Sequence, residues 1–179
     1  DAIPEAVITA QADPTDADGD GVSGRVSWVD GGRIGRLGWK GSVPDLAEFV
    51  RDALTAEMGL TLPHVDGMSF GRQRDDDDVP DPELTADDAA LLTDFLRALA
   101  PPPRRVPDDP DSADQGEAAF TELGCARCHT PSLEGPDGPV ALYSDLLLHD
   151  ILPPGSPGVE EAGASATEFR TPPLWGLSH

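Results

Sequence analysis

Basic side chains are scarce in this sequence of 179 residues. Lysine and arginine together number 12, against 34 aspartates and glutamates, and Lys40 is the only lysine. The formal net charge at pH 7 is −22. Proteins that bind nucleic acids or anionic membrane surfaces do so through clusters of basic residues. We therefore expect neither of these as a partner.

Hydrophobic residues are also few, and they form no long run. Leu, Ile, Val and Phe account for 39 residues, while glycine and proline account for 19 each. No apolar run approaches the roughly 20 residues that cross a bilayer, so we expect no transmembrane segment. The low apolar content predicts a thin hydrophobic core with many turns and loops. A large apolar cofactor would help to fill such a core.

Two segments carry strong helical signals. Apolar residues recur at helical spacing over 45–58 and 86–99, so both are predicted to be helices. Asp45 and Thr85 stand at the positions of N-terminal caps. Glu48, three residues after Asp45, completes the pattern of a capping box.

Weaker signals lie elsewhere in the chain. A third, shorter helix is predicted over 113–123, with Ser112 as its cap and Gly124 as its stop. Residues 144–151 are expected to form one or two helical turns. A short extended run is expected over 22–29, where valines and a tryptophan stand among glycines.

The strongest motif is Cys125-Ala126-Arg127-Cys128-His129. This C-x-x-C-H spacing is typical of covalent haem attachment. Two thiols three residues apart reach the two vinyl groups on one side of a porphyrin, and the histidine that follows them binds the iron. We therefore expect Cys125 and Cys128 to form the thioethers of a haem c, and His129 to be the proximal iron ligand.

Other uses of the two cysteines fit less well but stay open. A thioredoxin-like dithiol would follow a strand within a βαβ unit, whereas a helix is predicted before this motif. A zinc site needs four ligands, commonly from a second Cys/His pair, and the sequence has no such pair. A disulfide between cysteines three residues apart has poor geometry.

The helix before the motif contains Gly116 and Phe120. A Gly-x-x-x-Phe pattern ahead of C-x-x-C-H resembles the start of many small cytochrome c domains, where the aromatic ring packs near the haem. Ordinary core packing of Phe120 is the alternative. Together with the predicted helices, this pattern predicts a mainly α fold, a cytochrome c-like helical domain with long loops.

Several stretches, taken in order, resemble the di-haem oxidoreductases, also called thiol-oxidoreductase-like proteins. This family is distantly similar to the bacterial di-haem cytochrome c peroxidases. The resemblance covers roughly residues 3–179, and the blocks at 143–150 and 169–177 are its most specific parts. The matching blocks are residues 34–40 (IGRLGWK), 57–61 (EMGLT), 82–84 (PEL), 125–131 (CARCHTP), 143–150 (YSDLLLHD) and 169–177 (FRTPPLWGL).

The resemblance implies a two-haem protein, although this chain holds one C-x-x-C-H motif. We expect the chain, which lacks an initiator methionine and a signal peptide, to be a fragment of such a protein. Residues 1–110 would be an inter-haem region that completes a missing first haem domain. Residues 111–179 would be a C-terminal cytochrome c-like haem domain, truncated at its end.

The function implied is that of the haem-binding, electron-transfer portion of a di-haem oxidoreductase. In the full-length protein, with its second haem, this would be an oxidoreductase or a peroxidase. The alternative is a single-haem electron-transfer module with no catalysis of its own. The partner would be a redox protein or a small-molecule oxidant. Because thioether attachment takes place outside the cytoplasm, we expect a periplasmic or exported protein.

The ligand opposite His129 is not evident from the sequence. His149 is a candidate haem-pocket residue because it lies in the 143–150 block beside Asp150; a hydrogen bond to a carbonyl or a propionate is the alternative to ligation. Trp39 is a candidate for relaying electrons between two haems, as the resemblance to the di-haem peroxidases implies. The alternative is a tryptophan packed in the core. The other candidates are expected to be structural or terminal: Met58 in the core, Met68, His64 in a loop, and His179 at the end.

Asp16, Asp18 and Asp20 alternate with small residues in the manner of a calcium-binding loop. The twelfth position is Ser27 instead of the bidentate glutamate of an EF-hand, and the flanks do not resemble helices. The loop is therefore no complete EF-hand. A calcium site with ligands from elsewhere in the chain and a solvated acidic turn both remain open.

Overall fold

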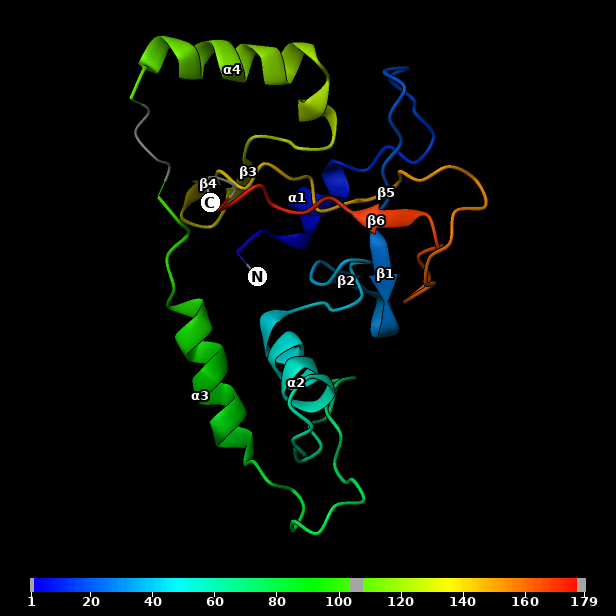
Figure 1. Ribbon diagram of the computed structural model, residues 1–179, viewed down its shortest axis with the longest axis vertical. Helices are drawn as coiled ribbons and strands as arrows, with labels where there is room; N and C mark the ends of the chain where they lie inside the picture. Colours follow the sequence, from blue (N-terminus) through cyan, green and yellow to red (C-terminus); the bar gives the residue numbers. More distant parts are fainter. Residues whose placement is uncertain (1, 104–107, 177–179) are drawn as a thin grey trace.

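The computed structural model describes residues 2–103 and 108–176, which form an elongated molecule (Figure 1). This part of the chain contains four α-helices: α1 (Glu5–Ala10), α2 (Leu46–Ala56), α3 (Ala86–Arg97) and α4 (Pro110–Glu122). It also contains two 3-10 turns, η1 (Asp30–Gly32) and η2 (Cys125–Arg127). The helices α2 and α3 lie at one end of the molecule, and α4 lies at the other. No described helix has the length and apolar content to cross a membrane.

Six short strands form three antiparallel pairs. They are β1 (Ser27–Val29) with β2 (Arg33–Gly35), β3 (Leu133–Gly135) with β4 (Gly138–Val140), and β5 (Leu148–Asp150) with β6 (Glu168–Arg170). The prediction of a mainly α fold is therefore wrong. The Gly- and Pro-rich segments, which cannot sustain helices, fold instead into these pairs and the loops between them.

The three helices predicted from the sequence form close to their expected positions. The helix expected over 45–58 is α2, and the side chain of Asp45 caps it by accepting a hydrogen bond from the backbone N–H of Glu48. The helix expected over 86–99 is α3, which begins with a full capping box between Thr85 and Asp88. The third helix, α4, starts at Pro110 and is capped by Asp109.

Two local predictions are wrong. Ser112 lies inside α4 and does not cap it, because the Asp109–Pro110 pair offers a cap and a preset helical φ three residues earlier. Residues 144–151 form no helical turn. They run in an extended path that ends in β5, because the backbone of Leu148 pairs with Arg25 on one side and with Arg170 on the other.

The main hydrophobic core joins the beginning of the described chain to its end. It combines residues of the first third with residues that follow the C-x-x-C-H motif; its buried members are Ile3, Ile8, Val26, Ile34, Leu133, Leu142, Leu146 and Leu147. Both of the segments expected as domains, 1–110 and 111–179, contribute to it. The division into an inter-haem region and a haem domain stays a prediction.

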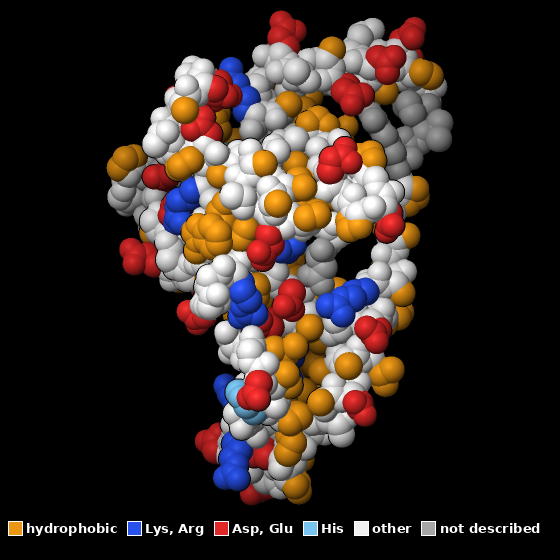
Figure 2. Space-filling model, turned by 180° about the vertical axis from the view of Figure 1, so that it is seen from behind, with side chains coloured by type: hydrophobic (Ala, Val, Ile, Leu, Met, Phe, Trp, Pro, Cys, Tyr) orange, Lys and Arg blue, Asp and Glu red, His pale blue; other side chains and the backbone are white. Residues whose placement is uncertain are grey.

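A second, smaller core holds α2 against α3. Val50, Leu54 and Leu62 are buried there with Ala89. The buried Arg51 of α2 donates to the carbonyls of Pro63 and Phe70, which fixes the following loop on the helix. Hydrophobic side chains nevertheless reach the surface of this end of the molecule (Figure 2), and they include the exposed Leu91, Phe95 and Leu99.

Segments 38–41 and 163–171 are linked by hydrogen bonds from a cationic side chain of each segment to backbone carbonyls of the other. Lys40 is buried, and its Nζ donates to the carbonyls of Ser165, Ala166 and Glu168 at 2.9, 3.1 and 2.5 Å. The same ammonium lies 3.7 Å from the centre of the Phe169 ring. In the opposite direction, the guanidinium Nε of Arg170 donates to the carbonyl of Gly38 at 2.9 Å.

Arg25 adds a third cation to this junction. Its guanidinium forms a two-pronged pair with Glu168, with Nε–Oε1 and Nη2–Oε2 distances of 2.5 and 2.7 Å. The hydrogen bond from Arg25 lowers the pKa of Glu168 from 4.5 to about 2, although burial acts in the opposite direction. The β5–β6 hairpin is thus attached to the first third of the chain through backbone pairing and charge together.

We predict that Lys40→Met lowers the free energy of unfolding by about 1–3 kcal/mol, because it removes the donor from three partly buried hydrogen bonds. Urea unfolding followed by circular dichroism measures the change. Arg74→Met, which removes an exposed cation from the loop after α2, is the control and should change stability by less than about 0.5 kcal/mol. A Lys40→Met variant as stable as the control would show that Lys40 does not hold the hairpin.

Candidate functional site

A pocket of about 360 Å³ lies beside the C-x-x-C-H motif. One wall comes from the motif itself, and the others come from the 38–41 segment, from β5 and from β6 with the residues after it. The lining residues are Trp39, Gly124, Cys125, Cys128, His129, His149, Ile151, Phe169, Arg170, Thr171 and Pro172. The volume is within the range of small-molecule and cofactor sites.

The motif occupies a tight turn that follows α4 directly. Gly124 adopts a φ of +81°, a left-handed conformation that glycine tolerates and that ends the helix, as the sequence predicts. The turn η2 follows, and the backbone N–H of His129 donates to the carbonyl of Cys125 at 3.0 Å. Both cysteines are unpaired, Cys125 exposed and Cys128 half-buried. The two thiols and the imidazole therefore face one pocket from a single turn.

The imidazole of His129 is held in one tautomer. Its Nδ1 lies 2.8 Å from the carbonyl oxygen of Tyr143, and a carbonyl only accepts, so Nδ1 carries the proton. Nε2 is then the nitrogen that holds the lone pair in the neutral imidazole, which is the form that binds a metal. Tyr143 has a φ of +53°, an uncommon conformation for a residue with a side chain.

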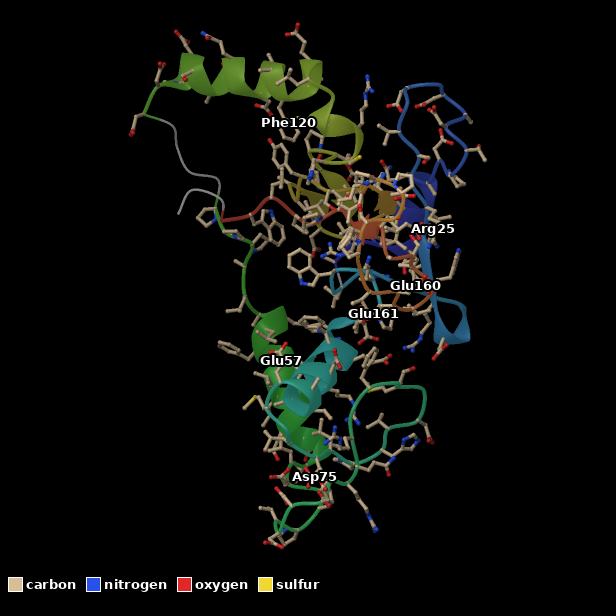
Figure 3. All side chains as sticks on the ribbon, turned by 45° about the vertical axis from the view of Figure 1, so that its right-hand side comes forward. Arg25, Glu57, Asp75, Phe120, Glu160 and Glu161 are labelled. Atoms are coloured by element: carbon tan, nitrogen blue, oxygen red, sulfur yellow. The ribbon has the colours of Figure 1, made fainter. Side chains whose placement is uncertain are left out.

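Phe120 stabilises the same pair of residues from α4. Its ring meets those of His129 and Tyr143 edge to face, with centroid distances of 6.4 and 5.7 Å. Figure 3 shows Phe120 at the end of α4, on the side that faces the rest of the molecule. The aromatic residue that the sequence places near the haem thus contacts the histidine of the motif.

The residues of the pocket fit a covalently bound haem. Thiols and a neutral imidazole with a free Nε2 are the donors that haem c requires. The rest of the lining is largely apolar, through Trp39, Ile151, Phe169 and Pro172, and suits a porphyrin face. Trp39 is 79% exposed at this site, so it does not have the packed position that was its alternative.

His149 also lines the pocket, but both of its ring nitrogens are occupied. Nδ1 lies 2.9 Å from the carbonyl of Ser23, and Nε2 lies 2.8 Å from Oδ2 of Asp145. Both partners are acceptors, so both nitrogens donate. Ligation of iron by His149 would break one of these bonds. The site also requires glycine at position 24, where a Cβ would lie 2.7 Å from Cε1 of His149.

The charge of His149 follows from these partners. Burial alone lowers its pKa, but the hydrogen bonds to Asp145 and Cys128 outweigh burial and raise the pKa from 6.5 to about 10. His149 is therefore an imidazolium at neutral pH. It ties the loop that ends at Gly24 to the segment behind the haem motif.

The other sequence candidates lie away from the pocket lining. Met58 is 65% exposed just after α2, so its expected place in the core is wrong. Met68 lies in a groove between α2 and α3. His64 is exposed and pairs with Asp66. His179 lies outside the described residues.

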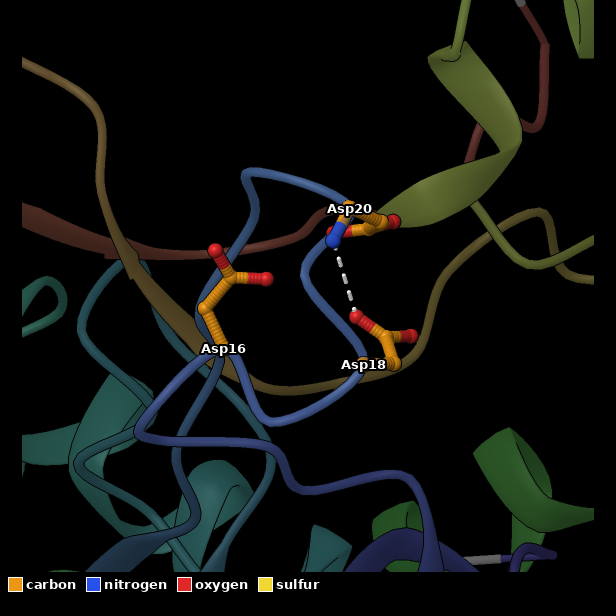
Figure 4. Close-up of side chains that lie close together, drawn as sticks. All are labelled: Asp16, Asp18 and Asp20. Carbon is orange, nitrogen blue, oxygen red and sulfur yellow. Dashed lines mark hydrogen bonds between the residues drawn. The ribbon is translucent and has the colours of Figure 1, made fainter.

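The three aspartates of the N-terminal loop gather as the sequence suggests. Carboxylate oxygens of Asp16, Asp18 and Asp20 lie within 4.8 Å of one another (Figure 4). The loop also contacts the haem motif, because Arg127 Nη1 donates to the carbonyl of Asp20 at 2.5 Å and Nε lies 3.5 Å from its carboxylate. Asp20 thus already has a cationic partner. Calcium at this loop stays a prediction.

Sequence reasoning assigned no role to several residues in or beside the pocket. Tyr143 acts through its backbone carbonyl, which no residue-type pattern reveals. Asp145 and Arg170 both lie within blocks that resemble the family, 143–150 and 169–177. Their charge within these blocks was the available signal.

Comparison with known proteins agrees with this geometry. The model of one family, described as "di-haem oxidoreductase, putative peroxidase", matches residues 1–179. Searches of curated proteins and of solved structures found no match. The match covers the whole chain, including the motif turn and the hairpin that encloses the pocket. The chain therefore belongs to the di-haem oxidoreductase family, a haem-dependent group of redox proteins.

Proposed function

We propose that this chain binds one haem c in the pocket beside residues 125–129. Cys125 and Cys128 would anchor the porphyrin, and Nε2 of His129 would bind the iron. The observation that carries the proposal is the 2.8 Å hydrogen bond from Nδ1 of His129 to the carbonyl of Tyr143, which leaves Nε2 available toward the pocket. A redox dithiol would not require this arrangement. A zinc site would use it too, but it needs a fourth ligand, and the one other ligand-type side chain in the lining, His149, is engaged at both ring nitrogens.

The role that follows is electron transfer within a di-haem oxidoreductase. The haem supplies one-electron redox chemistry when it is bound. His129 is oriented by Tyr143 and Phe120, while Trp39, Ile151 and Phe169 supply apolar surface around the site. We propose a second haem in the full-length protein, an exported location, and a redox protein or small-molecule oxidant as partner. The net charge of −22 would favour a basic redox partner, with salt-dependent association.

A peroxidase and a plain electron-transfer module differ at the position opposite His129. Both ring nitrogens of His149 already donate hydrogen bonds, which favours a site in which this residue is not the second iron ligand. An open position would give a high-spin haem that binds cyanide or peroxide, whereas two protein ligands would give a low-spin haem that does not. An optical spectrum of the complete haem-loaded protein, with and without cyanide, separates the two functions.

We predict that Cys125→Ala combined with Cys128→Ala abolishes covalent haem, because both thioethers are lost. Each single variant should retain the haem through one bond. His129→Ala should keep the covalent haem but change its Soret band, since the iron loses its proximal ligand. Intact-mass analysis and absorption spectra after expression with a haem-maturation system measure these outcomes. Absence of covalent haem in the unmodified protein would overturn the proposal.

We predict that His149→Gln leaves the Soret band unchanged but alters the pH dependence of stability. The pKa of His149 is about 10 when folded and near 6.5 when unfolded. Between these values the folded protein holds the additional proton, so its stability decreases as pH rises through that window, by at most about 1.4 kcal/mol per pH unit. Urea unfolding at about pH 7 and pH 9 measures the slope.

The variant should have a flatter slope than the unmodified protein over that window. His64→Gln replaces an exposed histidine and is the control, which should keep the original slope. A changed Soret band in His149→Gln would instead indicate ligation.

We also predict that calcium raises the melting temperature relative to a chelator, through the carboxylates of Asp16, Asp18 and Asp20. Asp18→Asn should remove this difference, whereas Asp114→Asn on α4 should retain it as the charge-matched control. Differential scanning calorimetry measures both variants. A melting temperature indifferent to calcium and chelator would show that the loop is only a solvated acidic turn.

A further inference from the structure

Arg170 is a cation in the lining of the haem-motif pocket. It is the last residue of β6, and its backbone N–H donates to the carbonyl of Trp39 at 2.9 Å. Its side chain donates from Nε to the carbonyl of Gly38 at 2.9 Å and from Nη1 to the carbonyl of Thr171 at 3.0 Å. These bonds fix the guanidinium at the pocket, yet both of its acceptors are neutral.

Asp145 is the carboxylate whose charge acts on Arg170, and it already accepts hydrogen bonds from other groups. Burial lowers the pKa of Arg170 below its ordinary value, and the charge of Asp145 only partly opposes this. The two oxygens of Asp145 accept from the backbone N–H of Leu147 and from His149, at 3.0 and 2.8 Å. None of the hydrogen bonds or ion pairs in the described ranges joins Arg170 to a carboxylate. Arg170 therefore lies in a partly buried site with its charge only partly compensated.

Such a charge favours an anionic partner in the pocket, because a desolvated ion without a counter-ion is costly. The surroundings make this cation unusual, since acidic residues outnumber basic ones by 34 to 12 in this chain. A guanidinium is also the group best suited to a carboxylate, which it binds through two parallel hydrogen bonds. Lining position, fixed geometry and charge thus all point to a carboxylate ligand.

We propose that Arg170 binds a propionate carboxylate of the haem held by Cys125, Cys128 and His129. This inference rests on the proposed function, because the propionates reach the pocket only with the haem. Arg170 is then a positioning residue with two connected tasks. It fixes the 38–41 segment through backbone carbonyls, and it keeps one propionate ionised near the iron.

A purely structural Arg170, which only holds Gly38 and Thr171, is the competing explanation. The two differ in what the haem experiences. A propionate paired with a guanidinium loses its proton at lower pH than an unpaired one. Loss of the cation should therefore lower the reduction potential and move the pH range over which the potential changes to higher pH. A structural role would change stability but leave that pH range in place.

The experiment compares Arg170→Gln, Arg170→Lys and the unmodified haem-loaded protein. The control is Arg74→Gln, which makes the same charge change at an exposed loop residue. Intact mass first establishes covalent haem, and spectroelectrochemical titration then gives the reduction potential across pH. The titratable and charged groups around this region are Asp145 and His149 beside the motif, Glu168 on β6 with its partner Arg25, and Lys40 on the 38–41 segment, and all are retained in every variant.

We expect Arg170→Gln to retain covalent haem and to have a lower reduction potential. The midpoint of the pH dependence of the potential should move to higher pH, to a proton concentration at least threefold lower. Arg170→Lys should recover part of that shift, and Arg74→Gln should show none. Covalent haem with an unshifted pH profile in both Arg170 variants would overturn the propionate contact alone. No covalent haem in the unmodified protein would instead overturn the proposed function. If Arg170→Gln does not fold, the profile of Arg170→Lys decides.

Discussion

The structure depends on two cationic side chains that cross between segments 38–41 and 163–171 in opposite directions. Lys40 reaches into the second segment and satisfies three carbonyls, while Arg170 reaches back and satisfies that of Gly38. A chain with so few long hydrophobic runs has little apolar surface with which to hold remote loops together. Two cations, the buried Lys40 and the partly buried Arg170, provide the connection instead, and apolar residues of the pocket lie beside it.

The site gains its chemical character from backbone groups as much as from side chains. The carbonyl of Tyr143 sets the tautomer of His129, and the carbonyl of Ser23 occupies His149. Two histidines 20 residues apart therefore have different hydrogen-bond environments. One is bonded through Nδ1 alone, and the other donates from both nitrogens. This difference distinguishes the candidate ligand from the residue that ties the adjoining loop in place.

Features that depend on neighbouring residues were predictable from the sequence, and features that depend on distant ones were not. The α2 and α3 helices follow from local caps and apolar spacing, and the haem motif follows from three residues in five positions. The long-range pairings are different, since Leu148 pairs with Arg170 in β6 and with Arg25 in the first third of the chain, and no local pattern encodes either pairing. The mainly α prediction failed because it extended local helical signals to segments whose structure is decided by long-range contacts. The roles of Tyr143 and Arg170 escaped for the same reason.

The distance along the chain between the walls of the pocket has a consequence for how the protein matures. Gly38 and Arg170 are separated by 132 positions, and the C-x-x-C-H turn lies between them. Closing so long a loop is slow, because its entropic cost precedes the contacts that reward it. The C-x-x-C-H turn is local, so it forms without waiting for this closure. In the proposed function, thioether attachment at Cys125 and Cys128 would meet an open turn, and the attached cofactor would be a nucleus on which the β5–β6 hairpin docks.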